Sequence, residues 1–235
     1  MLEQQQQTII NWFDKTYKSK GFSYLRPPEA YLSFVEILDL KPEDSVVDIA
    51  CGPGLFLKLA YEKGCQCSGI DASKLAIQMA KSYVPKSDVR KSNAENLPFP
   101  DNSFDVVVCL GALERFINLD VALSQLLRVA KNNALFCFLV RNSNSLFWQL
   151  GVRIMKRQNL VGHQDAKTLE EWQDIYVSSG FHIKKIIPDQ WPLQKFFSIL
   201  PLTLRKKFLP SIHNGIMPLR FAGEFIFLLS IESSS

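Results

Sequence analysis

Short runs of β-forming residues alternate with amphipathic segments along most of this chain. Val46, Val47 and Ile49 have the continuous apolar character of a strand buried on both faces, residues 66–70 predict a second strand, and residues 104–110 are the strongest strand signal. Apolar positions at helical spacing follow these strands. This alternation predicts right-handed crossovers and a mostly parallel sheet with helices on both faces. Further strands are predicted at residues 89–91, 134–140, 180–187 and 224–231, and helices at 54–63, 73–82, 119–130, 146–155 and 169–178.

The amino-terminal segment precedes this alternation. Residues 2–19 carry an uneven helical pattern that Gly21 ends, and we expect a lid helix over residues 1–26 whose Tyr17 and Tyr24 face a ligand. Ordinary apolar packing on the domain is the alternative for this helix. Pro27 and Pro28 then open a second predicted helix, which ends before the Lys-Pro pair at 41–42.

The first predicted strand leads into two closely spaced glycines. Gly52 and Gly54 let the backbone approach a ligand because they have no Cβ, and the helix that follows points its free N–H groups at the same place. Asp71, at the end of the second strand, stands where doubly wound folds bind a ribose diol. A dinucleotide fingerprint requires a third glycine where this chain has Leu57, so the pattern disfavours a nicotinamide cofactor.

Four motifs occur in register along the chain: Asp48-x-Ala50-x-Gly52-x-Gly54, Asp71, residues 93–99 and residues 102–107. In this order the chain resembles the class I S-adenosylmethionine (SAM)-dependent methyltransferases. The likeness is greatest to the small-molecule group of ubiquinone and menaquinone methyltransferases. It covers roughly residues 30–190 and implies a seven-stranded, doubly wound, Rossmann-like α/β sheet. The family often has glycine at the position of Ala50.

The resemblance implies that SAM is the cofactor and assigns its binding residues by motif position. Gly52 and Gly54 come near the methionine part, Asp71 binds the ribose, and an asparagine replaces the aspartate that often contacts the adenine amino group. Asp48 orients either the glycine loop or the cofactor ammonium. The full cofactor-binding set is Asp48, Ala50, Gly52, Gly54, Asp71, Asn93, Ala94, Glu95 and Leu110.

The acceptor side is predicted from three residues. Many relatives have a histidine at the position of Arg115, and an arginine cannot act as the base that this histidine supplies. Arg115 therefore binds an anionic acceptor or forms an ion pair with Glu114. His163 is the candidate base, with a solvent-facing loop histidine as the alternative.

Residues 190–222 separate the last two predicted strands and are rich in Phe, Leu, Pro and Trp. We expect a helical cap inserted into the single domain of residues 1–235. A helix pair on the domain edge or across a dimer interface is an alternative, and an encounter with a membrane surface is a weaker one, because three prolines divide the segment.

Composition limits the class of protein. With 235 residues, 47% hydrophobic and 21% charged, the chain is long enough for one large α/β domain, and its net charge of +4 gives no support to nucleic-acid binding. Five cysteines and no secretory segment favour a reducing, cytoplasmic compartment and no metal site. The sequence predicts a methyltransferase for a small apolar or amphipathic acceptor, as a monomer or homodimer. A catalytically silent, protein-binding subunit is the alternative.

Overall fold

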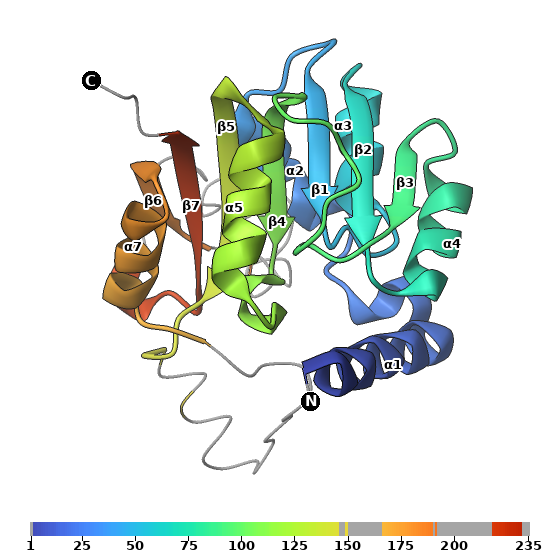
Figure 1. Cartoon of the computed structure of the whole chain (residues 1–235), viewed down its shortest axis with the longest axis horizontal. Coiled ribbons are helices and arrows are strands. Elements are labelled where there is room, and N and C mark those ends of the chain that lie inside the picture. The colour runs from blue at the N-terminus through green and yellow to red at the C-terminus, as the bar shows by residue number, and fades with distance from the viewer. Residues whose placement is uncertain (1, 146–148, 150–165, 190, 192–217, 232–235) are drawn as a thin grey trace, which may run out of the picture.

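A computed structural model describes the chain except for residues 1, 146–148, 150–165, 190, 192–217 and 232–235. Its described residues form a seven-stranded sheet in the order β3-β2-β1-β4-β5-β7-β6 (Figure 1). Strands β1 to β5 run parallel to their neighbours, and β7 is antiparallel to both β5 and β6. The sheet is therefore a mixed one, and the doubly wound α/β architecture predicted from the sequence is present.

The strands lie close to their predicted positions. Strand β5 begins four residues earlier than predicted. The sequence did not predict this part of the strand because residues 131–133 are polar and lack a continuous apolar run. A register shift against β4 marks the same place. The strands are β1 Ser45–Ile49, β2 Gln66–Asp71, β3 Asp88–Lys91, β4 Phe104–Leu110, β5 Ala130–Arg141, β6 Phe181–Pro188 and β7 Glu224–Ile231.

Side-chain caps define the start of several helices. The Ser73 hydroxyl accepts a hydrogen bond from the backbone N of Ala76, and Thr168 and Glu171 form a capping box. Gly21, at φ 53°, follows the last residue of the first helix. The helices are α1 Leu2–Lys20, α2 Glu29–Leu38, α3 Leu55–Glu62, α4 Lys74–Tyr83, α5 Leu119–Val129 and α7 Leu169–Ser178, with the 3-10 turns η1 Gly21–Tyr24, η2 Leu113–Arg115 and η3 Leu219–Phe221.

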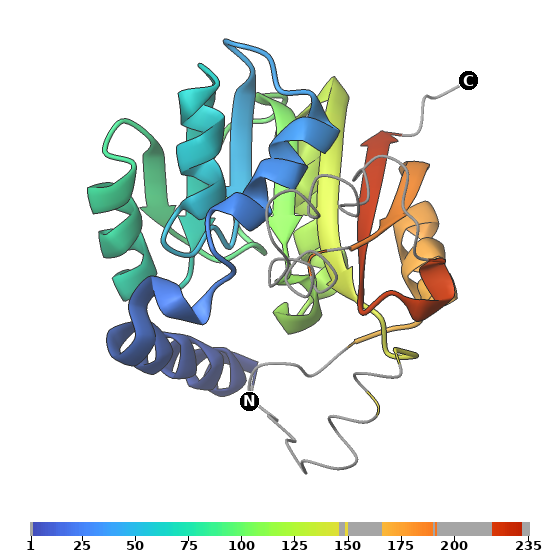
Figure 2. The same ribbon diagram turned by 180° about the vertical axis from the view of Figure 1, so that it is seen from behind.

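Helices cover both faces of the sheet (Figures 1 and 2). On one face α5 and α7 pack through Leu123, Leu126 and Trp172 against the strands. On the other face α2, α3 and α4 bury Phe34, Phe56 and related side chains. Apolar burial on both faces explains why the central strands are continuous hydrophobic runs.

Strand order reverses between β1 and β4, so a crevice opens there at the carboxyl ends of the strands. Helix α1 lies across this end of the sheet (Figures 1 and 2). The predicted helix at 146–155 and most of the predicted cap at 190–222 lie outside the described residues. In the part of the chain that the structure describes, no helix is both long and apolar enough to span a membrane.

Candidate cofactor and acceptor site

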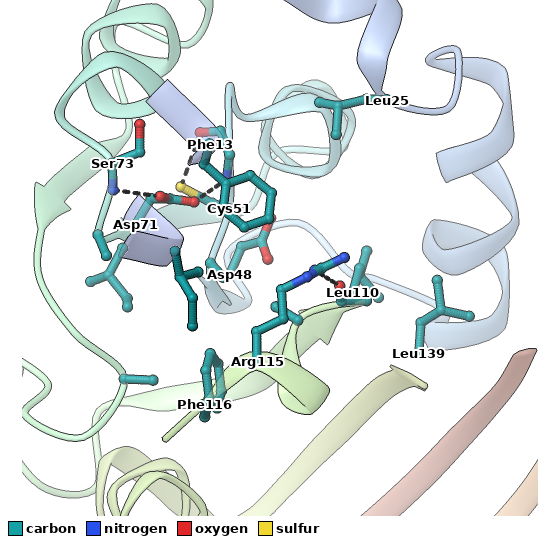
Figure 3. A pocket seen from close by; sticks show the side chains of 18 of the residues that line it. Phe13, Leu25, Asp48, Cys51, Asp71, Ser73, Leu110, Arg115, Phe116 and Leu139 are labelled. Carbon is teal, nitrogen blue, oxygen red and sulfur yellow. Dashed lines mark hydrogen bonds between the residues drawn. The ribbon is translucent and has the colours of Figure 1, made fainter. Parts of the chain in front are cut away.

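A cavity of about 390 Å³ lies between α1 and the carboxyl ends of the strands. Its wall is built from segments far apart in the sequence: α1, the glycine loop after β1, the end of β2, the loop after β3, and the ends of β4 and β5. Figure 3 shows its charged and apolar side chains gathered around one space. Eight of the nine residues predicted to bind cofactor lie in the wall, and Gly54 is the exception.

The glycine loop and Asp71 are joined by hydrogen bonds. The Asp71 carboxylate accepts from the backbone N of Gly52 at 2.9 Å and from the backbone N of Ser73 at 2.8 Å (Figure 3). Burial raises the pKa of Asp71 to about 6, although both hydrogen bonds favour its ionised form. A buried carboxylate held in one orientation by two backbone donors is suited to accept hydrogen bonds from a diol.

The two glycines of the loop have different structural roles. A Cβ on Gly52 would come within 3.0 Å of the Tyr17 hydroxyl, which shows how closely the loop approaches the lid. Gly54 instead caps α3 at φ 86°, and a Cβ there would meet Ala80 of α4 and Val84, the residue that ends α4. Gly54 therefore differs from its predicted role: it shapes the turn and lets α3 and α4 pack closely, and it does not contact the cavity.

Residues 93–95 form the wall next to β3. Ala94 is buried, and the Asn93 side-chain oxygen accepts from the backbone N of Glu95 at 3.3 Å. The Glu95 carboxylate accepts from the backbone N of Asn118 at 3.0 Å, so it fixes this loop to the start of α5. These contacts fix residues 93–95 in the cavity wall, where the family resemblance predicts the adenine ring.

Asp48 lies at the back of the cavity beneath the glycine loop. It is 3% exposed, and burial raises its pKa well above the usual range, with the Asp71 carboxylate adding to the rise. Two buried carboxyl groups thus share one small region of the wall. A cation or hydrogen-bond donor that enters this region stabilises their ionised forms.

The three residues predicted for the acceptor side have different positions. The Arg115 side chain lies in the cavity wall, where its Nη1 donates to the carbonyl oxygen of Gly111 and its guanidinium lies 5.2 Å from the centre of the Phe13 ring (Figure 3). Glu114 is buried but does not line the cavity, and its carboxylate accepts a hydrogen bond from the backbone N of Arg141. Glu114 thus positions the end of β5. His163 lies outside the described residues.

Helix α1 closes the cavity with its apolar face. Gln6, Ile9, Phe13 and Tyr17 line the cavity at helical spacing, and Tyr24 of η1 joins them. The Ser73 hydroxyl donates a hydrogen bond to Asp14, which ties the helix to the start of α4. Both tyrosines that the sequence predicts to face a ligand therefore line the cavity.

Four charged residues at the β5–β7 side of the cavity were not found from the sequence. Arg26 donates to Asp189 at 2.8 Å and to Glu224, and Glu224 also pairs with Arg141 at 3.4 Å. The other terminal nitrogen of Arg26, Nη1, is buried and has no hydrogen-bond partner among the described residues. The sequence signal was weak, because Arg26 only precedes two prolines and its partners are far away in the chain.

The fold places buried carboxyl groups beside a glycine loop at the carboxyl ends of the strands. This arrangement is typical of α/β domains that bind a nucleotide-like cofactor. The family model described as "Methyltransferase domain" matches residues 47–138. The chain is 27% identical over 167 residues to the uncharacterized methyltransferase YcgJ of Bacillus subtilis, covering 68% of this chain and 66% of that protein. It is 28% identical over 149 residues to the ubiquinone biosynthesis O-methyltransferase of Nitrosomonas europaea, covering 61% and 63%.

The solved structure of the Bacillus subtilis YcgJ protein has the same fold, with a TM-score of 0.62 over 88% of this chain and 99% of that one, at 19% identity. Residues 47–138 therefore match a methyltransferase domain, and SAM is the cofactor that this match implies. The matches leave about a third or more of these curated relatives' length unmatched. The substrates of these relatives are therefore not assigned to this chain.

Proposed function

We propose that this chain transfers a methyl group from SAM to a small apolar or amphipathic acceptor that binds beneath α1. The observation that carries this proposal is the single cavity that joins the polar wall around Asp71 to the apolar wall of Phe13, Phe116 and Leu139. A site for cofactor and acceptor must place both molecules in contact, and one continuous cavity meets that need.

The cofactor fits the polar half of the cavity. Asp71 accepts from the ribose hydroxyls, residues 93–95 flank the adenine, and Asp48 with the Gly52 backbone faces the methionine ammonium. The buried, unpartnered Arg26 Nη1 supplies a donor for the methionine carboxylate, because its other contacts already hold the guanidinium in place.

When bound, SAM would supply an electrophilic methyl carbon to an acceptor lone pair, and the electron pair of the broken carbon–sulfur bond would stay on the sulfur. The chain's own residues mainly orient the acceptor in line with that bond and exclude water, and α1 with Phe13 and Tyr17 covers the cavity for this purpose. Arg115 takes no proton from the acceptor.

His163 stays a candidate base on sequence grounds alone. If it takes the acceptor proton, its replacement by alanine lowers turnover by about 10² or more and leaves SAM affinity unchanged. If turnover barely changes, positioning in the closed cavity is enough. A cytoplasmic location and a monomer or homodimer likewise stay predictions.

The test of function has two parts. Calorimetry with SAM, S-adenosylhomocysteine (SAH) and NAD should show binding of the first two only. The protein is then incubated with methyl-labelled SAM and a fractionated small-molecule extract, and mass spectrometry follows SAH release and a product heavier by one methyl for hydrogen. Binding of SAH without any labelled product would favour the alternative of a catalytically silent subunit. Failure to bind either sulfur nucleoside would refute the proposal as a whole.

A further inference from the structure

Charged side chains are divided unequally between the two halves of the cavity. The polar half beside β1, β2 and β3 holds three carboxyl groups and no arginine, and the half beside β4, β5 and the lid holds three arginines and one carboxylate. The acidic set is Asp48, Asp71 and Glu95; the other set is Arg26, Arg115, Arg141 and Glu224. SAM has a net positive charge, so the acidic half suits most of the cofactor. Apart from Arg26, which is proposed to bind the methionine carboxylate, the basic half faces what the cofactor does not occupy.

Two of the arginines form ion pairs on the side of the cavity next to β6 and β7. Arg26 and Arg141 both contact Glu224, and Arg26 also contacts the buried Asp189. These groups tie the segment before α2 to β6 and β7, so they account for the charges at that end. Arg115 lines the cavity from η2, the 3-10 turn that follows β4.

Arg115 has both polar and apolar neighbours: its charge interacts with the Asp71 carboxylate, and apolar side chains of the cavity wall lie beside it. Figure 3 shows its guanidinium beside Leu110, on the side of the cavity where Leu139 also lies, and the Phe13 ring lies 5.2 Å from it. The hydrogen bond to the Gly111 carbonyl fixes the direction of the side chain. A cation held in one orientation beside apolar side chains recognises an anionic oxygen on an apolar molecule, because a neutral group there gains no charge-assisted hydrogen bond.

We propose that the acceptor is a small organic acid, with an apolar body against Phe13, Phe116 and Leu139 and a carboxylate that Arg115 binds. This inference rests on the proposed methyltransferase function and adds the chemical class of the acceptor. Arg115 acts as a residue of specificity and positioning. It anchors the end of the acceptor so that the atom to be methylated lies toward the polar half of the cavity.

The test compares acids with neutral molecules of the same shape. SAH-saturated protein is titrated by calorimetry with 3-phenylpropanoate and 3-phenylpropanamide, phenylacetate and phenylacetamide, and octanoate and octanamide. The acid of at least one pair should bind about 10- to 100-fold more tightly than its amide, the range expected for one charge-assisted hydrogen bond. Arg115→Met should remove this preference, and Arg115→Lys should keep part of it.

The control variant is Arg220→Met. Arg220 is an exposed arginine that also lies over an aromatic ring, that of Phe221, but it is outside the cavity. Its replacement should leave both the preference for acids and the affinity for SAH unchanged. A loss of preference in this variant as well would show that general surface charge explains the effect, and would overturn the inference.

Three other results would overturn it. The first is that no acid binds more tightly than its amide, or that no acid binds at all. The second is that the preference for the acid survives in Arg115→Met. The third is that this variant loses as much affinity for SAH as for the acids, which would assign Arg115 to the cofactor. The comparison on unmodified protein decides the matter even if Arg115→Met fails to fold. If SAH itself does not bind, the proposed function fails first, so the two failures are distinguishable.

Discussion

Asp71 and Asp105 lie on the two strands that flank β1, at opposite ends of the sheet. Asp71 is 8% exposed and has two backbone N–H donors, and burial raises its pKa to about 6. Asp105 has partial access to water and accepts from Lys131 at 2.8 Å and from the Ser45 backbone at 3.0 Å. Although its partial burial opposes the shift, these contacts lower the pKa of Asp105 to about 2.

The difference separates a carboxylate suited to binding from one that supports folding. Lys131 and Ser45 give Asp105 a complete set of partners in the free protein, so its charge stabilises the fold. Asp71 is left with an unfavourable charge until donors from outside arrive. Strain of this kind at the carboxyl ends of the strands is expected where a ligand completes the site.

The largest expected effect is on cofactor affinity. Asp71→Asn should weaken SAH binding by roughly 10²-fold or more, because each charge-assisted hydrogen bond to the ribose contributes about 1.5 to 3 kcal/mol. Calorimetry measures it. Asp105→Asn is the matched control at the other end of the sheet and should leave SAH affinity unchanged. Equal affinity of the Asp71 variant and the unmodified protein would remove Asp71 from the site.

Acidity should act on cofactor binding in the same direction. Since the pKa of Asp71 is about 6, protonation below that pH removes the charged acceptor of the ribose bonds. SAH affinity should then fall by up to about tenfold per pH unit below 6 and be constant above pH 7. Titrations between pH 8 and pH 5 test this, with Asp105→Asn expected to give the same profile. Constant affinity down to pH 5 would show that Asp71 binds no ribose.

The same two groups affect stability with opposite signs. The folded-state pKa of Asp71 lies above its usual value, so its contribution to stability increases as pH falls from about 6 to about 4. The folded-state pKa of Asp105 lies below its usual value, so its contribution is present above about pH 4 and is lost as pH falls toward 2. Acid unfolding of the ligand-free protein should therefore begin with groups such as Asp105.

A smaller effect is expected from Asp105→Asn on stability. The variant loses the charged contact with Lys131, but water screens this partly exposed pair, so the free energy of unfolding should fall by about 1 kcal/mol at pH 7. Urea unfolding measures the change. Asp101→Asn is the comparison, because that carboxylate is 74% exposed in its pair with Arg128 and should contribute less than about 0.5 kcal/mol. Equal losses in the two variants would contradict the contrast.

The smallest predicted effect concerns Ala50, which has φ 59° in the loop after β1. A side chain in this left-handed region costs about 1 to 2 kcal/mol, partly offset by the extra freedom of glycine in the unfolded chain. Ala50→Gly should thus raise the free energy of unfolding by about 0.5 kcal/mol. Ala72→Gly, in the neighbouring loop but without a positive φ, should lower it. A loss of stability in both variants would show that Ala50 is unstrained.

The fold was predictable because local patterns and tertiary structure agree. Residues 104–110 and 224–231 are apolar runs whose predicted bounds match β4 and β7, and Ser73 and Thr168 begin helices as their side chains suggest. The exposed start of β5 was not predicted, because strand residues that lie outside the core need not be apolar. Local sequence does not carry that information.

The site was predictable where one segment supplies a whole motif. Asp71, Asn93 and Gly52 reach the cavity as their spacing indicates. Arg26 was not predictable, since its partners Asp189 and Glu224 come from the last two strands and meet it only in the folded chain. Gly54 shows the opposite limit. Its position in the motif predicts a glycine, but the motif does not show which neighbouring residues require that glycine.

One hydroxyl group serves both the lid helix α1 and helix α4. Ser73 accepts from Ala76 as a helix cap, and its own hydrogen goes to Asp14 of α1. Aspartate caps helices as well as serine does, but it has no hydrogen to give and would set two carboxylates against each other. Positions 14 and 73 are therefore expected to change together during evolution, with an acid at one of them excluding an acid at the other.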